Sequence, residues 1–287
     1  MSEMTFKVAC VQMTAGREIE PNIAAAAEAI RAARAAGADF ILTPENTTMI
    51  EPRRALILEK AQPEDEHPAI PAFRALAAET GAWLLVGSLT IRLADGRCAN
   101  RSFLLDGTGR IAARYDKIHM FDVDLPGGER YRESATFQPG GEAVVAETPW
   151  GTVGLSICYD LRFPHLYRAL AQAGARFLTV PAAFTRPTGQ AHWHVLLRAR
   201  AIETGCFVFA PAQCGEHAEG RKTYGHSLIV APWGEILAEA GEEPGLIFAD
   251  IDPAKVDEAR GMVPALYHDR PFAAPPAAAR PLKAAGE

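Results

Sequence analysis

Short apolar runs rich in Val, Ile, Leu and Phe recur along the whole chain, and each is bounded by glycine, proline or polar residues. Runs of this length and composition predict buried β-strands. We predict strands at residues 6–13, 40–43, 83–90, 153–158, 177–181, 207–212 and 228–230.

Longer segments with helical character separate several of these runs. We predict helices at residues 22–36, 68–80, 165–173 and 191–203. Gly37 fits the end of the first, because a helix commonly stops at a left-handed glycine. Residues 97–115 instead predict a β-hairpin, with Asp106 and Gly107 at its turn. Strand and helix mostly alternate, so the pattern predicts an α/β or α+β fold with a mixed sheet.

No linker divides the chain, so we predict one domain at residues 1–272. Residues 60–68 read as an exposed loop within it. Residues 273–287 are rich in alanine and proline and contain few large apolar groups. We therefore expect this last segment to be a tail outside the domain.

Composition narrows the class of protein. The chain has 287 residues, of which 48% are hydrophobic and 22% charged, and a net charge of −6. These values exclude a disordered, collagen-like or coiled-coil chain. A generally basic nucleic-acid-binding surface is not expected. No apolar run approaches the length of a membrane span, and the N-terminus lacks the pattern of a signal peptide.

The cysteines favour free thiols. They number five, are widely spaced and contain no C-x-x-C pair. A secreted disulfide scaffold or a zinc ribbon has a different pattern, so we expect a reducing cytoplasm. We expect Cys10, inside an apolar run, to pack as a small apolar residue.

Three predicted strands end beside a reactive side chain, which is where ligands gather in α/β sheets. The first is the run 40–43, which Pro44 and Glu45 follow. Burial would raise the pKa of such a carboxylate and suit it to general-base catalysis. Taken alone, the same residue also fits a loop glutamate that caps the next helix.

The second place is the segment 115–122. Lys117 and His119 fall on the same side of an extended chain there, flanked by Asp116 and Asp122. A lysine among aromatic residues can act as a desolvated amine or as an electrostatic stabiliser. Taken alone, the segment also fits a surface strand with paired charges.

The third place is the run 153–158, which ends in Cys158 and leads into a polar turn and a helix. The dipole of a helix N-terminus stabilises a nearby thiolate. The backbone amide of Tyr159 is placed to help form an oxyanion hole. The arrangement has the logic of a nucleophile elbow without the G-x-S-x-G sequence. A buried structural cysteine is the alternative, and the polar residues that follow argue against it.

In this order the three segments resemble the carbon–nitrogen hydrolase (nitrilase) superfamily, whose catalytic residues are Glu, Lys and Cys. The resemblance covers residues 5–272. It places these residues at Glu45 in TPEN, Lys117 in YDKIHMFD and Cys158 in ICYDLRFP. A second family glutamate matches Glu133 in YRES. The resemblance implies a four-layer αββα sandwich that forms homodimers through helices and needs no metal or organic cofactor.

Further segments resemble the Nit branch of small ω-amide amidases and, within it, the deaminated-glutathione amidases. They are PAAF at 181–184, TGQAHW at 188–193, LRARAIE at 197–203, AQCG at 212–215 and YGHS at 224–227. Gln190 stands where that branch carries proline. We expect substrate contacts from Tyr159, Arg186 and His192. Arg186 is the only cation in the predicted loop after Phe184 and could clamp a carboxylate; an exposed arginine is the alternative.

The implied reaction is hydrolysis of a small linear amide through a cysteine thioester. Glu45 takes the proton of Cys158, and Lys117 and the Tyr159 amide stabilise the oxyanion. The acyl group stays open between deaminated glutathione, α-ketoglutaramate or α-ketosuccinamate, and N-carbamoyl amino acids.

Three rival interpretations fit less well. A papain-like hydrolase would carry the C-G-[SA]-C-[WY] signature, which is absent. A metalloenzyme built on His192 and His194 is disfavoured, since residues two apart on a helix face different ways. A binding protein that keeps the fold would not need all four of the matched catalytic residues.

Overall fold

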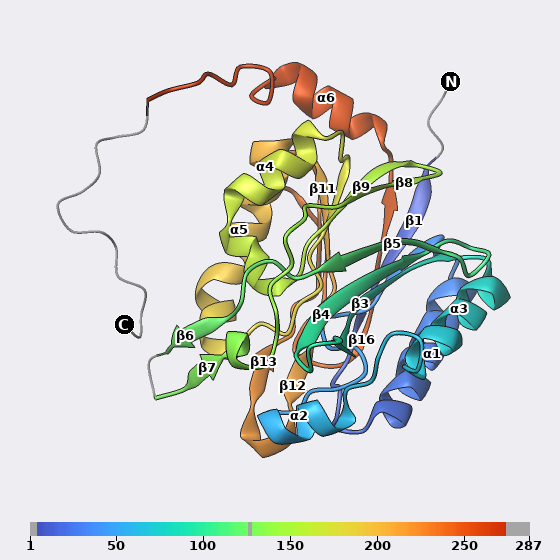
Figure 1. The fold of residues 1–287 in the computed structure, drawn as a ribbon. Coiled ribbons are helices and arrows are strands. Elements are labelled where there is room, and N and C mark those ends of the chain that lie inside the picture. Colours follow the sequence, from blue (N-terminus) through green and yellow to red (C-terminus); the bar gives the residue numbers. More distant parts are fainter. Residues whose placement is uncertain (1–4, 126–127, 274–287) are drawn as a thin grey trace.

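Two six-stranded mixed sheets pack face to face, and helices cover the outer face of each (Figure 1). The computed structural model describes residues 5–125 and 128–273. The four layers confirm the predicted αββα sandwich in a single domain. The expected tail lies, from residue 274 on, outside the described residues.

The first sheet has the spatial order β16-β1-β2-β3-β4-β5, in which β1, β2 and β3 are parallel. Its strands are β1 (Phe6–Gln12), β2 (Phe40–Leu42), β3 (Trp83–Arg92), β4 (Cys98–Leu105), β5 (Ile111–Asp116) and β16 (Gly245–Ile251). β16 comes from the far end of the chain. It pairs antiparallel with β1 over the whole length of both strands, from Phe6 opposite Ile251 to Gln12 opposite Gly245.

The second sheet has the order β15-β14-β11-β10-β9-β8, in which β9, β10 and β11 are parallel. Its strands are β8 (Val145–Thr148), β9 (Gly151–Leu155), β10 (Phe177–Thr179), β11 (Phe207–Ala210), β14 (Leu228–Val230) and β15 (Ile236–Glu239). Two short ribbons lie at the lower end of Figure 1. They pair β6 (Asp122–Asp124) with β7 (Arg130–Arg132) and β12 (Cys214–Glu216) with β13 (Lys222–Tyr224).

Helices α1 (Ile19–Ala35) and α3 (Ala69–Thr80) cover the first sheet, and α4 (Pro164–Gln172) and α5 (Arg186–Thr204) cover the second. One apolar cluster fills the space between the sheets, where Phe40 meets Phe209 edge to face. A second cluster lies between the first sheet and its helices. Each large side chain fully buried in these clusters contributes about 1.5–3 kcal/mol of transfer free energy.

The predicted strands and the hairpin are confirmed, but two helices begin earlier than expected. α1 starts at Ile19 instead of residue 22, and α5 starts at Arg186 instead of residue 191. Each contains a proline in its first turn, Pro21 or Pro187, where the missing N–H costs no hydrogen bond. The proline in each first turn therefore made the start of the helix hard to recognise from the sequence.

Some elements left no clear pattern in the sequence. They include α2 (Arg54–Lys60), α6 (Ala254–Met262) and the half-exposed strands β8 and β15. The segment 61–68 has almost no regular structure, as expected, but it is only partly exposed because His67 is buried. No helix among the described residues is long and apolar enough to cross a membrane.

Candidate active site

The segments that follow β2, β5, β7 and β9 bring four polar side chains together. Lys117 lies at the centre, and its Nζ donates hydrogen bonds to Glu45 Oε1 (2.9 Å) and to both carboxylate oxygens of Glu133 (3.0 and 2.9 Å). Cys158 is buried in the same cluster, where its thiol and the Glu45 carboxylate act on each other's pKa. The structure thus places all four residues expected from the resemblance at one point.

Two further groups hold the Glu45 carboxylate. The backbone N–H of Ala183 donates to Oε2 (2.8 Å), and Asn100 Nδ2 donates to Oε1 (3.0 Å). The same Asn100 nitrogen lies 3.2 Å from Glu133 Oε1. Asn100 thus links the two carboxylates, although nothing in the sequence of β4 distinguished it.

Cys158 lies in a strained turn. It follows the end of β9 by three residues and opens a short 3₁₀ helix, Cys158–Arg162. Its φ is 49°, in the left-handed region that side chains other than glycine rarely adopt. Its backbone N–H donates to Pro181 O (3.0 Å), which anchors the turn to the strand end after β10. This is the conformation expected of a nucleophile elbow.

The buried carboxylate of Asp160 holds this turn in place. It accepts hydrogen bonds from the Ile157 N–H (2.9 Å), the Tyr115 hydroxyl (2.7 Å) and the His119 N–H (3.0 Å), and its Oδ1 lies 2.7 Å from His119 Nδ1. Tyr115 and His119 flank Lys117 in the chain. Asp160 therefore sets the position of the thiol relative to the ammonium.

The environment sets the charge of each group. Burial alone would raise the pKa of Glu45, but the Lys117 ammonium with its hydrogen bond, the neighbouring Cys158 thiol and the Ala183 N–H hold it below its usual value. Burial and the Glu45 charge raise the pKa of Cys158 well above that of a free thiol, despite Lys117. Burial opposes the charge of Lys117, but Glu133, Glu45 and Cys158 together raise its pKa well above the usual value.

One expectation from the sequence, a raised pKa for Glu45, is therefore wrong. The pKa of Glu45 is lowered, because the Lys117 ammonium lies 2.9 Å from its carboxylate. Cys158 rests as a thiol, because burial and the neighbouring carboxylate outweigh the dipole of a helix only one turn long. The resting site holds a carboxylate, an ammonium and a thiol.

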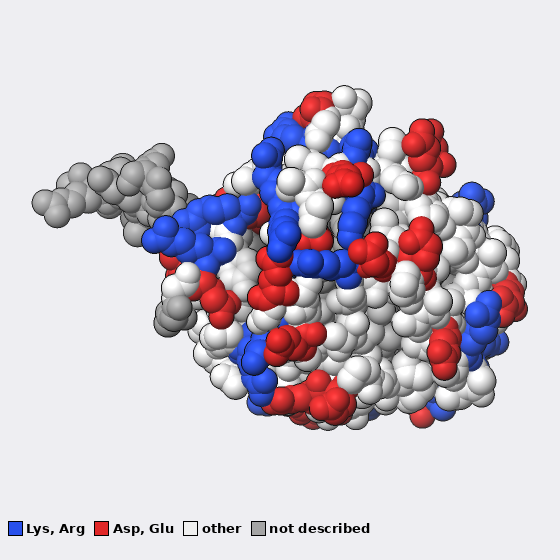
Figure 2. All heavy atoms as spheres, turned by 90° about the horizontal axis from the view of Figure 1, so that it is seen from below, with Lys and Arg blue, Asp and Glu red and all other residues white. Residues whose placement is uncertain are grey.

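A cavity of about 800 Å³ opens onto these groups. It is lined by residues from α2, from the β6–β7 and β12–β13 ribbons and from the start of α5, at the lower end of Figure 1. Figure 2 views this end directly and shows Lys and Arg side chains gathered among Asp and Glu. Tyr159 lines the cavity, as expected. In the described chain, no backbone or side-chain group accepts a hydrogen bond from its N–H.

The two other expected substrate contacts are placed differently. Arg186 lines the cavity, but it belongs to the first turn of α5 instead of a loop, and its guanidinium is paired with Glu242 (2.8 Å). His192 lies on the exposed face of α5, does not line the cavity, and packs against the Arg162 guanidinium (3.3 Å). The early start of α5 moves Arg186 from the expected loop onto the helix, whereas His192 was already expected on a helix and lies on its exposed face.

Arg221, which the sequence did not single out, lies in the cavity wall. It follows the short 3₁₀ helix Ala218–Gly220 between β12 and β13. Its guanidinium covers the Tyr131 ring at 5.7 Å and donates one hydrogen bond, from Nη2 to Ala183 O (3.3 Å). Its buried Nε has no partner within the described residues. This arginine is therefore positioned beside the catalytic group with donor capacity left over.

Known proteins resemble the chain over most of its length. Residues 7–261 match the family described as carbon–nitrogen hydrolase. The deaminated glutathione amidase of Yersinia enterocolitica is 40% identical over 266 residues, which is 92% of each chain. The crystal structure of the NitFhit protein of C. elegans superposes with a TM-score of 0.88 at 37% identity, covering 94% of this chain and 66% of that one.

One similar structure bears on the cysteine. A variant of the amidase from Nesterenkonia sp. AN1 superposes with a TM-score of 0.79 at 28% identity, over 94% of each chain. That structure has the acetamide moiety of fluoroacetamide added covalently at its active-site cysteine. With a family match over most of its length and this fold, the chain belongs to the carbon–nitrogen hydrolase family.

Proposed function

We propose that this carbon–nitrogen hydrolase cleaves deaminated glutathione, with Cys158 as the nucleophile. The observation that carries the proposal is the buried cluster in which Lys117 joins Glu45 to Glu133 while the Cys158 thiol interacts with the same Glu45. The relatives named as deaminated glutathione amidases supply the choice of substrate.

The first chemical step needs a base for a thiol that does not ionise by itself. Glu45 removes the proton from Cys158 as the sulfur attacks the amide carbon. The proton on Glu45 then passes to the leaving nitrogen, and the amine departs. A water molecule, deprotonated by the same carboxylate, hydrolyses the thioester and restores the thiol. No proton needs to enter from outside the cluster in either half of the reaction.

The tetrahedral intermediates carry a negative oxygen. Lys117 Nζ is a fixed cation, since two carboxylates surround it, and it complements that charge together with the Tyr159 N–H. Glu133 orients Lys117 and receives the Phe121 N–H (2.7 Å) on Oε2. Lys117 is therefore a stabilising group in this scheme and Glu133 a positioning residue.

Substrate selection rests on charge. Deaminated glutathione has a carboxylate beside its keto group and another at its glycine end, so the cavity needs cations that are not already neutralised. Arg186 is paired with Glu242, whereas Arg221 has no carboxylate partner among the described residues. We assign the carboxylate contact to Arg221, because a guanidinium binds a carboxylate through two parallel hydrogen bonds.

The test is a substrate panel with α-ketoglutarate release as the common readout for deaminated glutathione and α-ketoglutaramate. We expect kcat/KM to be highest for deaminated glutathione, with cysteinylglycine released in equal amount. A clear preference for α-ketoglutaramate would show that the proposed substrate is wrong. Release of ammonia from N-carbamoyl amino acids alone would show the same.

A matched pair of variants tests the role of Arg221. Arg221→Ala should raise KM for deaminated glutathione about 10-fold or more, the size of a lost charged hydrogen bond. It should leave a simple aliphatic amide almost unaffected. Arg186→Ala is the control, because its guanidinium is engaged by Glu242. Equal effects of the two variants, or an equal effect of Arg221→Ala on both substrates, would refute the assignment.

The site of action and the assembly are further parts of the proposal. All five cysteines are free and buried, which suits a reducing cytoplasm. Exposed apolar side chains gather on α5 and α6, among them Val195, Ile202 and Met262. A second copy of the chain would cover such a surface, in line with the homodimer that the family resemblance implies. Sedimentation of wild type and Ile202→Glu tests this, since a dimer should dissociate in the variant.

A further inference from the structure

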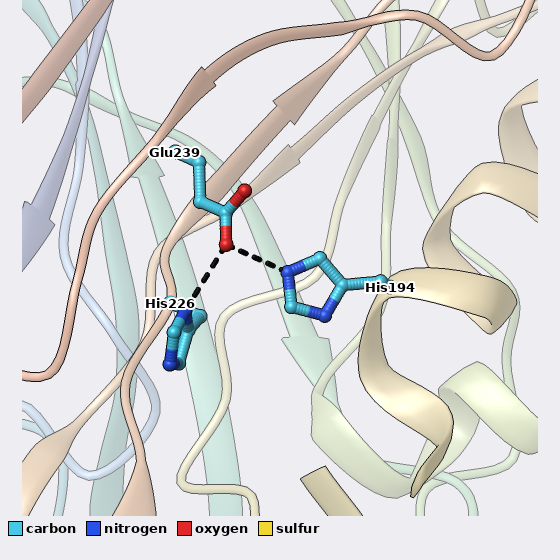
Figure 3. A group of neighbouring side chains, drawn as sticks. All are labelled: His194, His226 and Glu239. Carbon is cyan, nitrogen blue, oxygen red and sulfur yellow. Dashed lines mark hydrogen bonds and ion pairs between the residues drawn. The ribbon is translucent and has the colours of Figure 1, made fainter. Parts of the chain in front are cut away.

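Two histidines and a glutamate from three separate elements meet on the second sheet (Figure 3). His194 is on α5, His226 lies in the turn between β13 and β14, and Glu239 ends β15. One oxygen of Glu239 lies 2.8 Å from His194 Nε2 and 3.1 Å from His226 Nδ1. The three candidate ligand atoms all lie within 4.8 Å of one another. None of the three residues lines the active-site cavity.

The backbone around this group is fixed. The indole N–H of Trp193, the neighbour of His194 on α5, donates to His226 O (2.7 Å), and the His226 N–H donates to Gly241 O (3.0 Å). Glu239 faces Leu228 in the β14–β15 ladder. The Tyr224 ring stacks on the His226 imidazole at 4.3 Å. The three side chains are therefore held in place by structure that already exists without a ligand.

Two imidazole nitrogens and one carboxylate oxygen are the donors that a borderline metal ion such as zinc prefers. Zinc is bound by imidazole nitrogen at about 2.0 Å and by carboxylate oxygen at about 2.0–2.2 Å, and sites with two histidines and one glutamate keep a fourth position for water. Tetrahedral ligands at that distance lie about 3.3 Å apart, close to the two nitrogen–oxygen spacings above. A neutral imidazole frees the facing nitrogen by carrying its proton on the other one, so binding requires no net ionisation of either ring.

We propose that His194, His226 and Glu239 form a binding site for one divalent transition-metal ion of the zinc class. The side chains are 28%, 20% and 37% exposed, which gives an ion access from solvent and leaves room for a water ligand. A bound ion ties α5 to β15 and to the turn before β14. Its role is structural, since it lies outside the cavity that holds Cys158.

The test is a titration of the tag-free full-length chain with Co²⁺, whose visible absorption reports ligation. Every sample carries Cys158→Ala, which removes the reactive thiol as a competing ligand. We expect one equivalent of Co²⁺ to bind, and Zn²⁺ to displace it. His194→Ala, His226→Asn and Glu239→Gln should each weaken binding about tenfold or more, since even indirect changes at metal sites cost that much. Asparagine is chosen because it tolerates the left-handed backbone of His226.

His192→Ala is the matched control, because His192 lies on the same helix, two residues away, and outside the group. It should bind Co²⁺ as the parent does. Zn²⁺ should raise the melting temperature of the parent and of His192→Ala, and should raise it much less in the three ligand variants. No absorption at millimolar Co²⁺, or equal binding in the parent and the three ligand variants, would overturn the proposal.

Discussion

Glu45 and Glu239 each gather two side-chain donors, one inside the molecule and one at its surface. Glu45 is 3% exposed, whereas the Glu239 side chain is 37% exposed. For both, burial raises the pKa of the carboxyl, but the charged and hydrogen-bonding partners outweigh it and hold the pKa below the usual value. Removing one partner of a buried ion pair costs about 3–5 kcal/mol, but an exposed pair is worth about 0–1 kcal/mol. Losing one partner should therefore cost far more free energy of unfolding at Glu45 than at Glu239, although the two clusters have similar geometry.

The largest effect should come from the thiol. Cys158→Ser should lower kcat by about a thousandfold or more, because Glu45 is too weak a base to activate a hydroxyl. The melting temperature should change little, since serine is nearly the same size and shape as cysteine and fills the same buried position. The measurement is kcat on the best amide together with a thermal melt. Turnover within tenfold of wild type would disprove the role of Cys158.

A variant of Lys117 tests how much the buried cluster contributes to the free energy of unfolding. Lys117→Ala should lower kcat by about 10²-fold or more and destabilise the fold by about 3–5 kcal/mol, since two carboxylates then face each other without a cation. In metal-free protein, His194→Ala should cost less than about 1 kcal/mol. Urea unfolding measures both.

Two controls accompany Lys117. Lys117→Arg should restore little activity, because a planar guanidinium does not replace a compact ammonium. Borohydride should trap no Schiff base with a keto-acid substrate. A trapped adduct, or equal stability losses at Lys117 and His194, would contradict the comparison.

A variant of Asp160 tests whether this residue acts only by positioning Cys158. Asp160→Asn keeps the volume but replaces one acceptor with a donor, which misplaces the turn that carries Cys158. We expect kcat to fall about 10–100-fold while KM stays within about twofold. Steady-state kinetics on one substrate give both values. A change in KM alone would place Asp160 in substrate binding instead.

The pH profile should be flat where a free thiol would titrate. Glu45, with its lowered pKa, stays a carboxylate until the pH falls below its usual range, and Lys117 and Cys158 stay protonated because their pKa values are raised. Between pH 6 and 9, kcat/KM should therefore show no inflection near about 8.5. A rise through that pH would mean that a free thiolate is the attacking species.

The smallest effect is expected at Glu239. In metal-free protein, Glu239→Gln should change the free energy of unfolding at neutral pH by less than about 1 kcal/mol. Because the pKa of Glu239 is lowered in the fold, its contribution is present above the usual carboxyl pKa and is lost as the pH falls through the folded value. Urea unfolding at neutral and acidic pH measures this difference.

The parts of the site that could be predicted share one property. Glu45 and Cys158 each lie three residues after the end of an apolar parallel strand, and Lys117 directly follows the second strand of the predicted hairpin, so the local sequence pattern locates all three. Strands β2 and β9 could be predicted because buried parallel strands are continuous apolar runs. The four layers were implied by the resemblance, and two apolar clusters on either face of the first sheet account for them.

The residues that were missed depend on contacts across the chain. Asn100 and Asp160 act through partners 55 and 45 residues away, which no local pattern encodes. His192 was expected in the pocket but lies on the exposed face of α5, because the elements packed against a helix decide which of its faces is turned to solvent. The pair His192 and His194 was disfavoured as a metal site, and the partners that His194 does meet come from β15 and from the turn before β14.

The pairing of β1 with β16 has a consequence for synthesis on the ribosome. β1 is made before the other strands of the first sheet, and one of its edges stays open until residues 245–251 emerge. Contacts of such long sequence separation slow folding, and an open apolar edge can recruit other chains. The nascent first sheet therefore requires protection for almost the whole of translation, and a chain truncated before β16 keeps that edge permanently. Synthesis of β16 is therefore the event that covers the open edge of β1.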